Sequence, residues 1–243
     1  MKVLSIGNSF SQDAHRYIHQ VAKSYGKEIV TVNLYIPGCS LERHYGNMQT
    51  GVEDYEIELN GQSTGEKISL QAALQKESWD VVTLQQCSAL SGRVPTYEPY
   101  WQALADFVRK NCPTAKLYVH QTWVYEEGCD MLKNTAGFDS ADEMYYAVRN
   151  AYNLAARRIN ADEMIPCGNG MFYMERKGVK THRDFYHASL GVGRYLLALI
   201  WYGTLTGEKV EINDFNDFDE EVSLEEKRIA VEAAQYALSS PHF

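Results

Sequence analysis

The chain has 243 residues, of which 45% are hydrophobic and 23% are charged, a balance typical of soluble globular proteins. The formal net charge of −9 disfavours nucleic acid and anionic membrane surfaces as partners, because both require a basic face. No apolar run approaches the roughly 18 residues that a membrane span needs. A neutral small molecule is therefore the partner we expect.

The N-terminus leads directly into a strand-like run and lacks the charged, apolar and small-residue zones of a secretory leader. We therefore expect a cytoplasmic protein, or a secreted one if a leader has been removed. The five cysteines are scattered and follow no disulfide or zinc spacing. We expect neither a metal nor another cofactor.

Hydrophobic periodicity predicts strands that alternate with helices. The predicted strands are residues 2–6, 28–36, 79–84, 116–120 and 164–166. The predicted helices are residues 14–25, 69–77, 99–110, 141–159, 190–202 and a last one that starts at the Ser223–Glu226 capping box. Residues 52–69, around Asn60-Gly61, predict a hairpin inserted to cover another part of the fold.

This alternation predicts one α/β domain over residues 1–243. We expect a three-layer α/β/α sandwich around a mainly parallel, doubly wound sheet of about five strands, as in flavodoxin-like folds. Ligands of such sheets bind beyond the carboxyl ends of the strands. The residues that follow the predicted strands there are Ser9, Gly38, Gln85 and Trp123.

A serine and a distant Asp-x-x-His pattern together indicate nucleophilic catalysis. Serine needs a histidine base to become a nucleophile, and the base is usually oriented by a carboxylate. Asp184 and His187 can lie on the same turn, where the carboxylate selects the imidazole tautomer. The backbone N–H groups of Ser9 and Gly38 and the side-chain amide of Gln85 are candidate oxyanion donors at the same sheet edge.

Four sequence elements resemble the SGNH (GDSL-like) hydrolases. These are Gly7-Asn8-Ser9, Gly38 after the second strand, an amide after the third strand, and Asp184-x-x-His187; they occur in the family's order and span most of the chain. More narrowly, residues 79–88, 121–123 and 187–189 are similar to a bacterial, largely uncharacterised branch. Here Asn8 replaces the usual aspartate, and Gln85-Gln86 replaces the usual Gly-x-Asn-Asp block.

The resemblance implies an α/β/α esterase, lipase or carbohydrate deacetylase that uses no metal. It implies Ser9 as the nucleophile, His187 as the base, Asp184 as its orienting group and Gly38 as an oxyanion donor. Gln85 and Gln86 both remain candidates for the third donor, and Gln85 is favoured because it comes first after the strand.

Each site residue also has a structural interpretation. Ser9 or Ser11 can cap the following helix, and Asp184 can cap the helix after it. Gly38 sits in a common turn pair, so the turn and oxyanion interpretations can both hold. His182 is the rival base, two residues before Asp184.

Three further features are weaker candidates. His15 and His19 have i, i+4 spacing but lack an accompanying carboxylate motif, so a metal is not favoured. Cys39 and Cys87 follow predicted strands and fit buried packing better than nucleophiles. Trp123 could line a substrate groove, since sugar rings stack on aromatic faces.

The sequence thus predicts a serine hydrolase that cleaves a small acyl group, such as acetyl, from a carbohydrate ester. The alternatives are a thioesterase or lipase-like acyl hydrolase with the same triad, and a carbohydrate-binding protein without catalysis.

Overall fold

Seven strands form one sheet in the order β4-β3-β2-β1-β5-β6-β7 in the computed structural model, which describes residues 1–240. The strands are β1 (Lys2–Gly7), β2 (Val30–Tyr35), β3 (Tyr55–Leu59), β4 (Gln62–Ile68), β5 (Val81–Leu84), β6 (Lys116–His120) and β7 (Glu163–Ile165). The five strands β2, β1, β5, β6 and β7 pair in parallel, as predicted. β1 has β2 on one side and β5 on the other. The strands before β5 extend the sheet in one direction from β1, and β5, β6 and β7 extend it in the other.

The predicted hairpin at residues 52–69 forms β3 and β4, and it extends the sheet instead of covering another part of the fold. β3 pairs antiparallel with β2, and β4 pairs antiparallel with β3. The sheet therefore has seven strands where the sequence predicted about five. A parallel sheet leaves the backbone of its edge strand unpaired, and the hairpin satisfies that edge of β2.

Helices cover both faces of the sheet. The α-helices are α1 (Ser9–His15), α2 (Ile18–Ser24), α3 (Leu41–Thr50), α4 (Leu70–Lys76), α5 (Tyr100–Asn111), α6 (Ala141–Arg158), α7 (Cys167–Arg176), α8 (Val192–Thr206) and α9 (Leu224–Ser239). Shorter helical turns are η1 (Ser88–Leu90), η2 (Val94–Tyr97) and η3 (Leu132–Ala136). The predicted helix at 14–25 is interrupted between α1 and α2, and α3 and α7 were not predicted.

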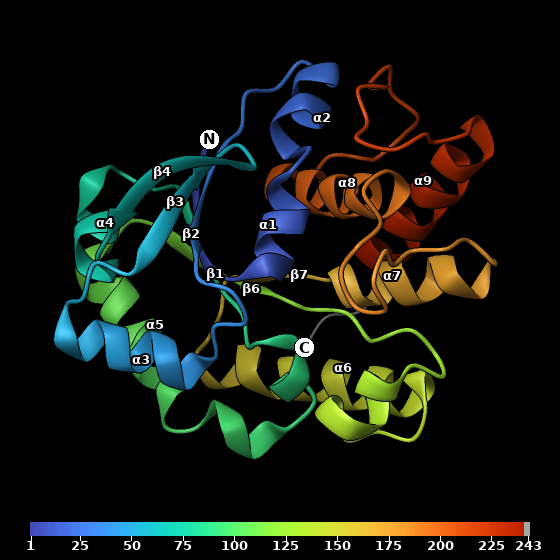
Figure 1. Cartoon of the computed structure of the whole chain (residues 1–243). Coiled ribbons are helices and arrows are strands. Elements are labelled where there is room, and N and C mark those ends of the chain that lie inside the picture. Colours follow the sequence, from blue (N-terminus) through green and yellow to red (C-terminus); the bar gives the residue numbers. More distant parts are fainter. Residues whose placement is uncertain (241–243) are drawn as a thin grey trace.

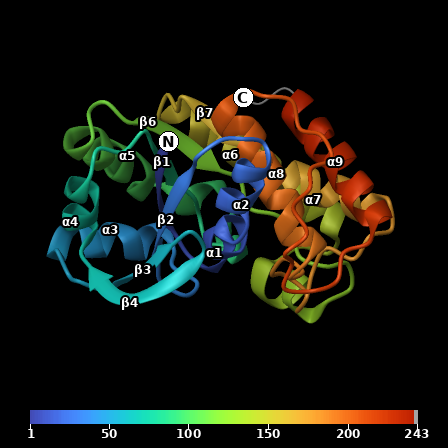
Figure 2. The ribbon, with the colours of Figure 1, turned by 90° about the horizontal axis from the view of Figure 1, so that it is seen from above.

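The two helical layers contain different parts of the chain (Figures 1 and 2). Helices α1, α2, α7, α8 and α9 pack together on one face, whereas α3, α4 and α5 pack on the other. Helix α6 lies beside α5, where Trp101 Nε1–H donates to the carbonyl of Ala155 (2.9 Å). The three-layer α/β/α prediction is therefore confirmed, and α1 and α8 lie in the same helical layer.

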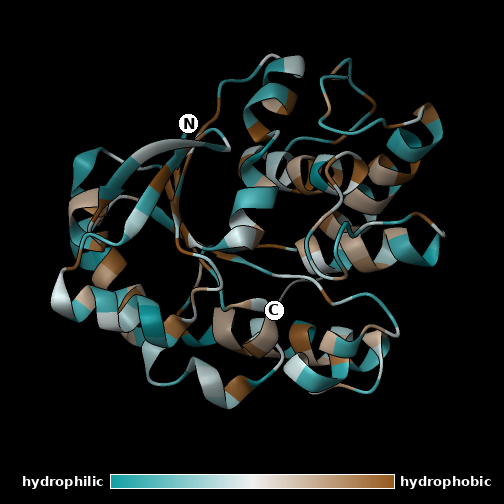
Figure 3. Cartoon of the chain, viewed as in Figure 1, coloured by the Kyte–Doolittle hydropathy of each residue, from teal (hydrophilic) through white to brown (hydrophobic). Residues whose placement is uncertain are grey.

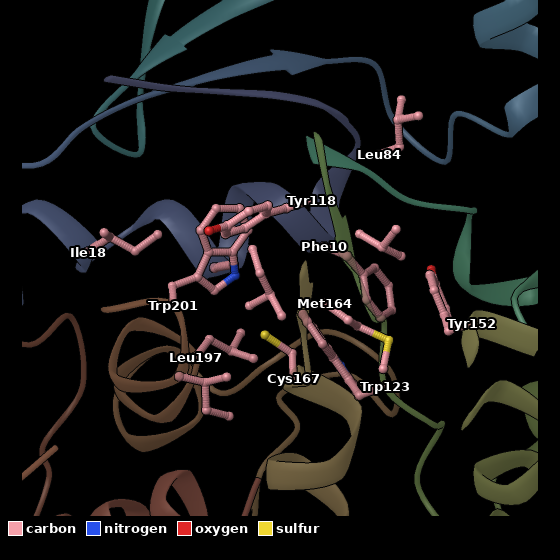
Figure 4. Close-up of a cluster of buried hydrophobic side chains, with 14 of the residues drawn as sticks. Phe10, Ile18, Leu84, Tyr118, Trp123, Tyr152, Met164, Cys167, Leu197 and Trp201 are labelled. Atoms are coloured by element: carbon pink, nitrogen blue, oxygen red, sulfur yellow. The ribbon is translucent and has the colours of Figure 1, made fainter. Parts of the chain in front are cut away.

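Hydrophobic residues concentrate on the central strands and on α8 (Figure 3). All four residues of β5 are buried, as expected for a parallel strand covered on both faces. Figure 4 shows Phe10 of α1, Trp123, Met164 of β7, and Leu197 and Trp201 of α8 in one cluster of buried side chains. Within residues 1–240, no helix has both the length and the apolar character that crossing a bilayer requires.

Candidate active site

The turn after β1 presents Ser9 at the first position of α1. Asn8 is the N-cap: its Oδ1 accepts from the backbone N–H of Phe10 (3.0 Å), while its own N–H donates to Ser11 Oγ (3.0 Å). A Cβ at Gly7 would lie 2.0 Å from Ser11 Oγ, so only glycine permits this close turn. Because Asn8 and Ser11 form the capping box, the capping interpretation of Ser9 is wrong and its hydroxyl is left for another partner.

Asp184 and His187 lie on the loop between α7 and α8. Residues 181–189 form a hairpin in which Ser189 N–H donates to the Thr181 carbonyl (2.6 Å). His187 donates twice to Asp184, from its backbone N–H to Oδ1 (2.9 Å) and from Nδ1–H to Oδ2 (2.8 Å). The carboxylate therefore holds the imidazole in the tautomer whose Nε2 is free to accept a proton.

The free nitrogen of His187 faces Ser9. Its Nε2 lies 2.8 Å from Ser9 Oγ, so the serine hydroxyl can donate to it. The structure thus brings together Ser9, His187 and Asp184, the three residues proposed from the sequence, in one hydrogen-bonded series. The Asp184 side chain is 45% exposed and that of His187 is 14% exposed, so the series opens to solvent at the carboxylate end.

Hydrogen bonding from His187 keeps Asp184 ionised. Partial burial raises the pKa of this carboxyl, but the side-chain and backbone donors of His187 and the nearby Arg183 outweigh it and leave the pKa below its ordinary value. An ionised Asp184 can stabilise the imidazolium that forms when His187 takes a proton.

Two backbone donors at this edge have no acceptor among residues 1–240. Ser9 is the first helical residue of α1, and the N–H groups of a first turn have no intrahelical partner. The N–H of Gly38 likewise donates to no group in the described chain, and Gly38 adopts a φ of 58°, which favours glycine. Both groups remain candidates for binding an oxyanion.

Gln85 holds the nucleophile turn instead of facing solvent. Its Nε2 donates to Asn8 Oδ1 (2.7 Å), and its Oε1 accepts from His120 Nδ1 (2.7 Å). Asn8 Nδ2 in turn donates to the carbonyl of Cys39 (3.1 Å), next to Gly38. The buried Gln85 amide thus supports the nucleophile turn through Oε1 and one N–H of Nε2. The second N–H of Nε2 has no acceptor among residues 1–240, and the oxyanion role of Gln85 stays a prediction.

Gln86 is also engaged within the protein. Its Oε1 accepts from the N–H groups of Leu41 (3.0 Å) and Cys87 (2.9 Å), while its Nε2 donates to the carbonyl of Thr96 (3.1 Å). It joins the start of α3 to the loop after β5. Because Gln86 Nε2 also lies 3.2 Å from Thr96 Oγ1, both of its N–H groups have acceptors within the protein.

Trp123 is fully buried, so its predicted place in a substrate groove is wrong. Its Nε1–H donates to the carbonyl of Tyr186 (2.8 Å), and its ring lies 4.2 Å from that of Phe10. Trp123 is thus bonded to the residue that directly precedes His187. The Tyr186 ring, 4.0 Å from the imidazole, is the aromatic group beside the base.

The remaining candidates lie away from Ser9 or are sealed. His182, the rival base, is buried and bonds to the Val124 carbonyl (3.0 Å) and to Glu175 (2.7 Å). It lines a separate cavity of about 680 Å³ that does not include Ser9. Burial raises the pKa of the Cys39 thiol to about 12, which excludes it as a ready nucleophile.

His15 and His19, whose spacing did not favour a metal, lie on different helices, α1 and α2. His15 Nε2 bonds to Ser5 Oγ (2.8 Å) inside the core. No cluster of three potential metal ligands occurs in the part of the chain that the structure describes.

Comparison with known proteins identifies the family. The family model of DUF4886, a domain of unknown function, matches residues 2–237. The chain belongs to the DUF4886 family. A DUF4886 protein from Bacteroides uniformis is 32% identical, with 98% of this chain and 94% of that chain covered and a TM-score of 0.90. No curated protein matches the sequence.

The DUF4886 fold is shared with SGNH-type hydrolases. A putative GDSL-like lipase from Parabacteroides merdae is 14% identical over 84% of this chain and 94% of its own, with a TM-score of 0.57. Axe2, an acetylxylan esterase from Geobacillus stearothermophilus, is 14% identical over 86% and 96%, with a TM-score of 0.55. At this identity the likeness establishes the fold, and it confirms the predicted structural resemblance.

Sequence reasoning missed the residues that support the site. Asn8 was noted only as a departure from the family pattern, yet it links the nucleophile turn, Gln85 and the loop of Gly38. Asp13 was not considered, although it lies one turn after Ser9 on α1 and bonds to Ala188, next to His187. The i, i+4 spacing of Ser9 and Asp13 was the available signal.

Proposed function

We propose that this protein is a serine hydrolase that cleaves carboxylic esters. The observation that supports this most directly is the hydrogen-bonded series from Ser9 Oγ through His187 to Asp184, at 2.8 Å for each step. This arrangement matches the requirement for a nucleophile, a base and an orienting carboxylate. It disfavours the alternative of a protein that only binds sugar, because binding alone does not require a matched base.

In this mechanism His187 Nε2 takes the proton of Ser9 as Oγ attacks the ester carbonyl. The backbone N–H groups of Ser9 and Gly38 donate to the oxyanion of the tetrahedral intermediate. The carbon–oxygen bond to the alcohol then breaks, and the imidazolium protonates the departing alkoxide. Water, deprotonated by His187, then attacks the acyl-serine carbonyl. The bond to Oγ breaks, the imidazolium returns its proton to Oγ, and the acid and free Ser9 are released.

We further propose that the acyl group is small, such as acetyl, and that the alcohol is a carbohydrate. The net charge of −9 favours a neutral substrate over an anionic one. The fold likeness to an acetylxylan esterase agrees with this substrate, and the likeness to a putative GDSL-like lipase keeps a longer-chain acyl hydrolase as the second candidate.

Hydrolysis of p-nitrophenyl esters of increasing acyl length distinguishes these candidates. Cleavage of the acetate, with a steep loss toward longer chains, supports a deacetylase, and acetylated oligosaccharides then identify the alcohol. A preference for long chains supports a lipase-like enzyme instead. If the folded protein hydrolyses neither the p-nitrophenyl esters nor the acetylated oligosaccharides, the hydrolase proposal is contradicted.

A further inference from the structure

Asp13 is a buried carboxylate with five donor contacts. Its side chain has no solvent exposure. Arg183 Nη1 lies 2.9 and 3.0 Å from its two oxygens, and Arg194 Nε and Nη2 lie 2.9 and 2.8 Å from Oδ1. The backbone N–H of Ala188 donates to Oδ2 (3.1 Å). A buried charge with this many donors is fully compensated only while all its partners stay in place.

The position of Asp13 joins the two halves of the candidate site. It lies four residues after Ser9 on α1, and therefore on the same side of that helix. Its partners Arg183 and Ala188 lie directly before Asp184 and directly after His187. One carboxylate on the nucleophile's own helix thus holds both ends of the segment that bears the base and its orienting group.

Packing alone leaves the tip of this hairpin weakly held. The side chain of Asp184 is 45% exposed and Phe185 is 56% exposed, so little apolar burial fixes their positions. Phe185 also has a φ of 75°, an unfavourable region for a bulky side chain. The loop after β6 holds the tip from one side, through Glu126 N–H to the Phe185 carbonyl (2.7 Å) and Trp123 Nε1–H to the Tyr186 carbonyl (2.8 Å). The contacts of Asp13 add the constraint from the α1 side.

We propose that Asp13 is a positioning residue that keeps His187 Nε2 within hydrogen-bonding distance of Ser9 Oγ. This inference rests on the proposed function for its kinetic consequences, but its geometric content is independent of any substrate. Asp13 acts through the Arg183–Ala188 segment and contacts no reacting atom.

Asp219 offers a matched control. It is a neighbouring carboxylate that bonds to Arg16 (2.7 Å) and Arg194 (3.0 Å), so it shares Arg194 with Asp13. It makes no hydrogen bond to the described residues 181–189. A substitution there disturbs the same group of charges without releasing the hairpin.

The test compares Asp13→Asn with Asp219→Asn in the full chain, below the melting temperature of each variant. We expect Asp13→Asn to lower kcat for p-nitrophenyl acetate about 100-fold with little change in KM, because a small misplacement of a catalytic group has effects of this order. Asp219→Asn should keep kcat within about twofold, although both variants lose thermal stability.

Proton NMR provides a readout that needs no turnover. The downfield Nδ1–H resonance of His187, assigned by its absence in His187→Ala, should shift or broaden in Asp13→Asn and stay unchanged in Asp219→Asn. An unchanged resonance and kcat in Asp13→Asn would overturn the positioning role, as would equal losses of kcat in both variants.

A wild-type protein without esterase activity would show that the proposed function is wrong. The NMR comparison needs no turnover, so it would still test the positioning role of Asp13. If Asp13→Asn does not fold, Arg183→Met breaks the same connection from the hairpin side. It should move the His187 resonance in the same way, and an unmoved resonance would contradict the proposal.

Discussion

Ser9 Oγ and His187 Nε2 lie 2.8 Å apart although 178 residues separate them in the chain. Ser9 begins the helix after the central strand β1, whereas His187 belongs to a hairpin that leads into α8. The two meet because α1 and α8 pack on the same face of the sheet. The contact therefore depends on the fold.

Removal of the nucleophile should abolish turnover without unfolding the protein. Ser9→Ala removes a hydroxyl that caps no helix, because Asn8 is the N-cap. We expect kcat for p-nitrophenyl acetate to fall by at least about 10⁴-fold in Ser9→Ala and by a similar factor in His187→Ala, because the members of a catalytic triad act as a unit. Ser69→Ala, which removes only the cap of α4, should retain activity and serves as the control. Normal turnover by Ser9→Ala would contradict the assignment.

Acid should unfold the protein through three buried histidines. Burial lowers the pKa of His15, His44 and His120 to about 3 each, whereas an unfolded histidine titrates near its ordinary value of about 6.5. The unfolded chain thus binds more protons as pH falls from about 6.5, and stability is lost. Three such groups reduce the free energy of unfolding by about 4 kcal/mol per pH unit in the region between pH 5 and 4.

Urea unfolding from pH 7 to 4 measures this slope. Glu58 contributes a slope of opposite sign. Burial raises the pKa of its carboxyl, so the folded state binds this proton at a higher pH than the unfolded state and gains stability as the pH falls. His44→Gln removes one titrating group and should flatten the slope by about a third. An unchanged slope in this variant would rule out His44 as a contributor.

Asn8→Asp should weaken the nucleophile turn even though aspartate is an equally good helix cap. Asn8 Nδ2 donates to the carbonyl of Cys39, and a carboxylate oxygen at that position would face the carbonyl without a proton. We expect the free energy of unfolding to fall by about 1–3 kcal/mol, the cost of a buried acceptor left unpaired. Urea unfolding checks this, and a more stable Asn8→Asp variant would show that the Cys39 contact is unimportant.

Phe185→Gly should stabilise the protein. Phe185 has a φ of 75° and is 56% exposed, so its conformation is costly and its ring gains little from burial. Glycine relieves about 1–2 kcal/mol of strain, offset by about 0.5–1 kcal/mol of greater entropy in the unfolded chain. Phe185→Ala removes the same ring but keeps the strain, so it is the matched control. Equal melting temperatures for the two variants would contradict this account.

Local sequence patterns determined the parts of the site that depend on near neighbours. The spacing of Asp184 and His187 places carboxylate and imidazole on one turn, and Gly7-Asn8-Ser9 after an apolar strand predicts a serine on the turn at the strand end. Alternating strands and helices likewise predicted the parallel sheet. These features follow from backbone geometry over a few residues, so they were visible without a structure.

Only the tertiary structure decided which side chains face the site and which support it from behind. Gln85 and Trp123 follow strands that end at the correct edge, but Gln85 points inward to Asn8, and Trp123 is buried and bonds to Tyr186. Asp13 acquired its role because α1, the hairpin and α8 converge on one carboxylate. Side-chain direction after a strand depends on packing between distant segments, and a single sequence contains no direct record of that packing.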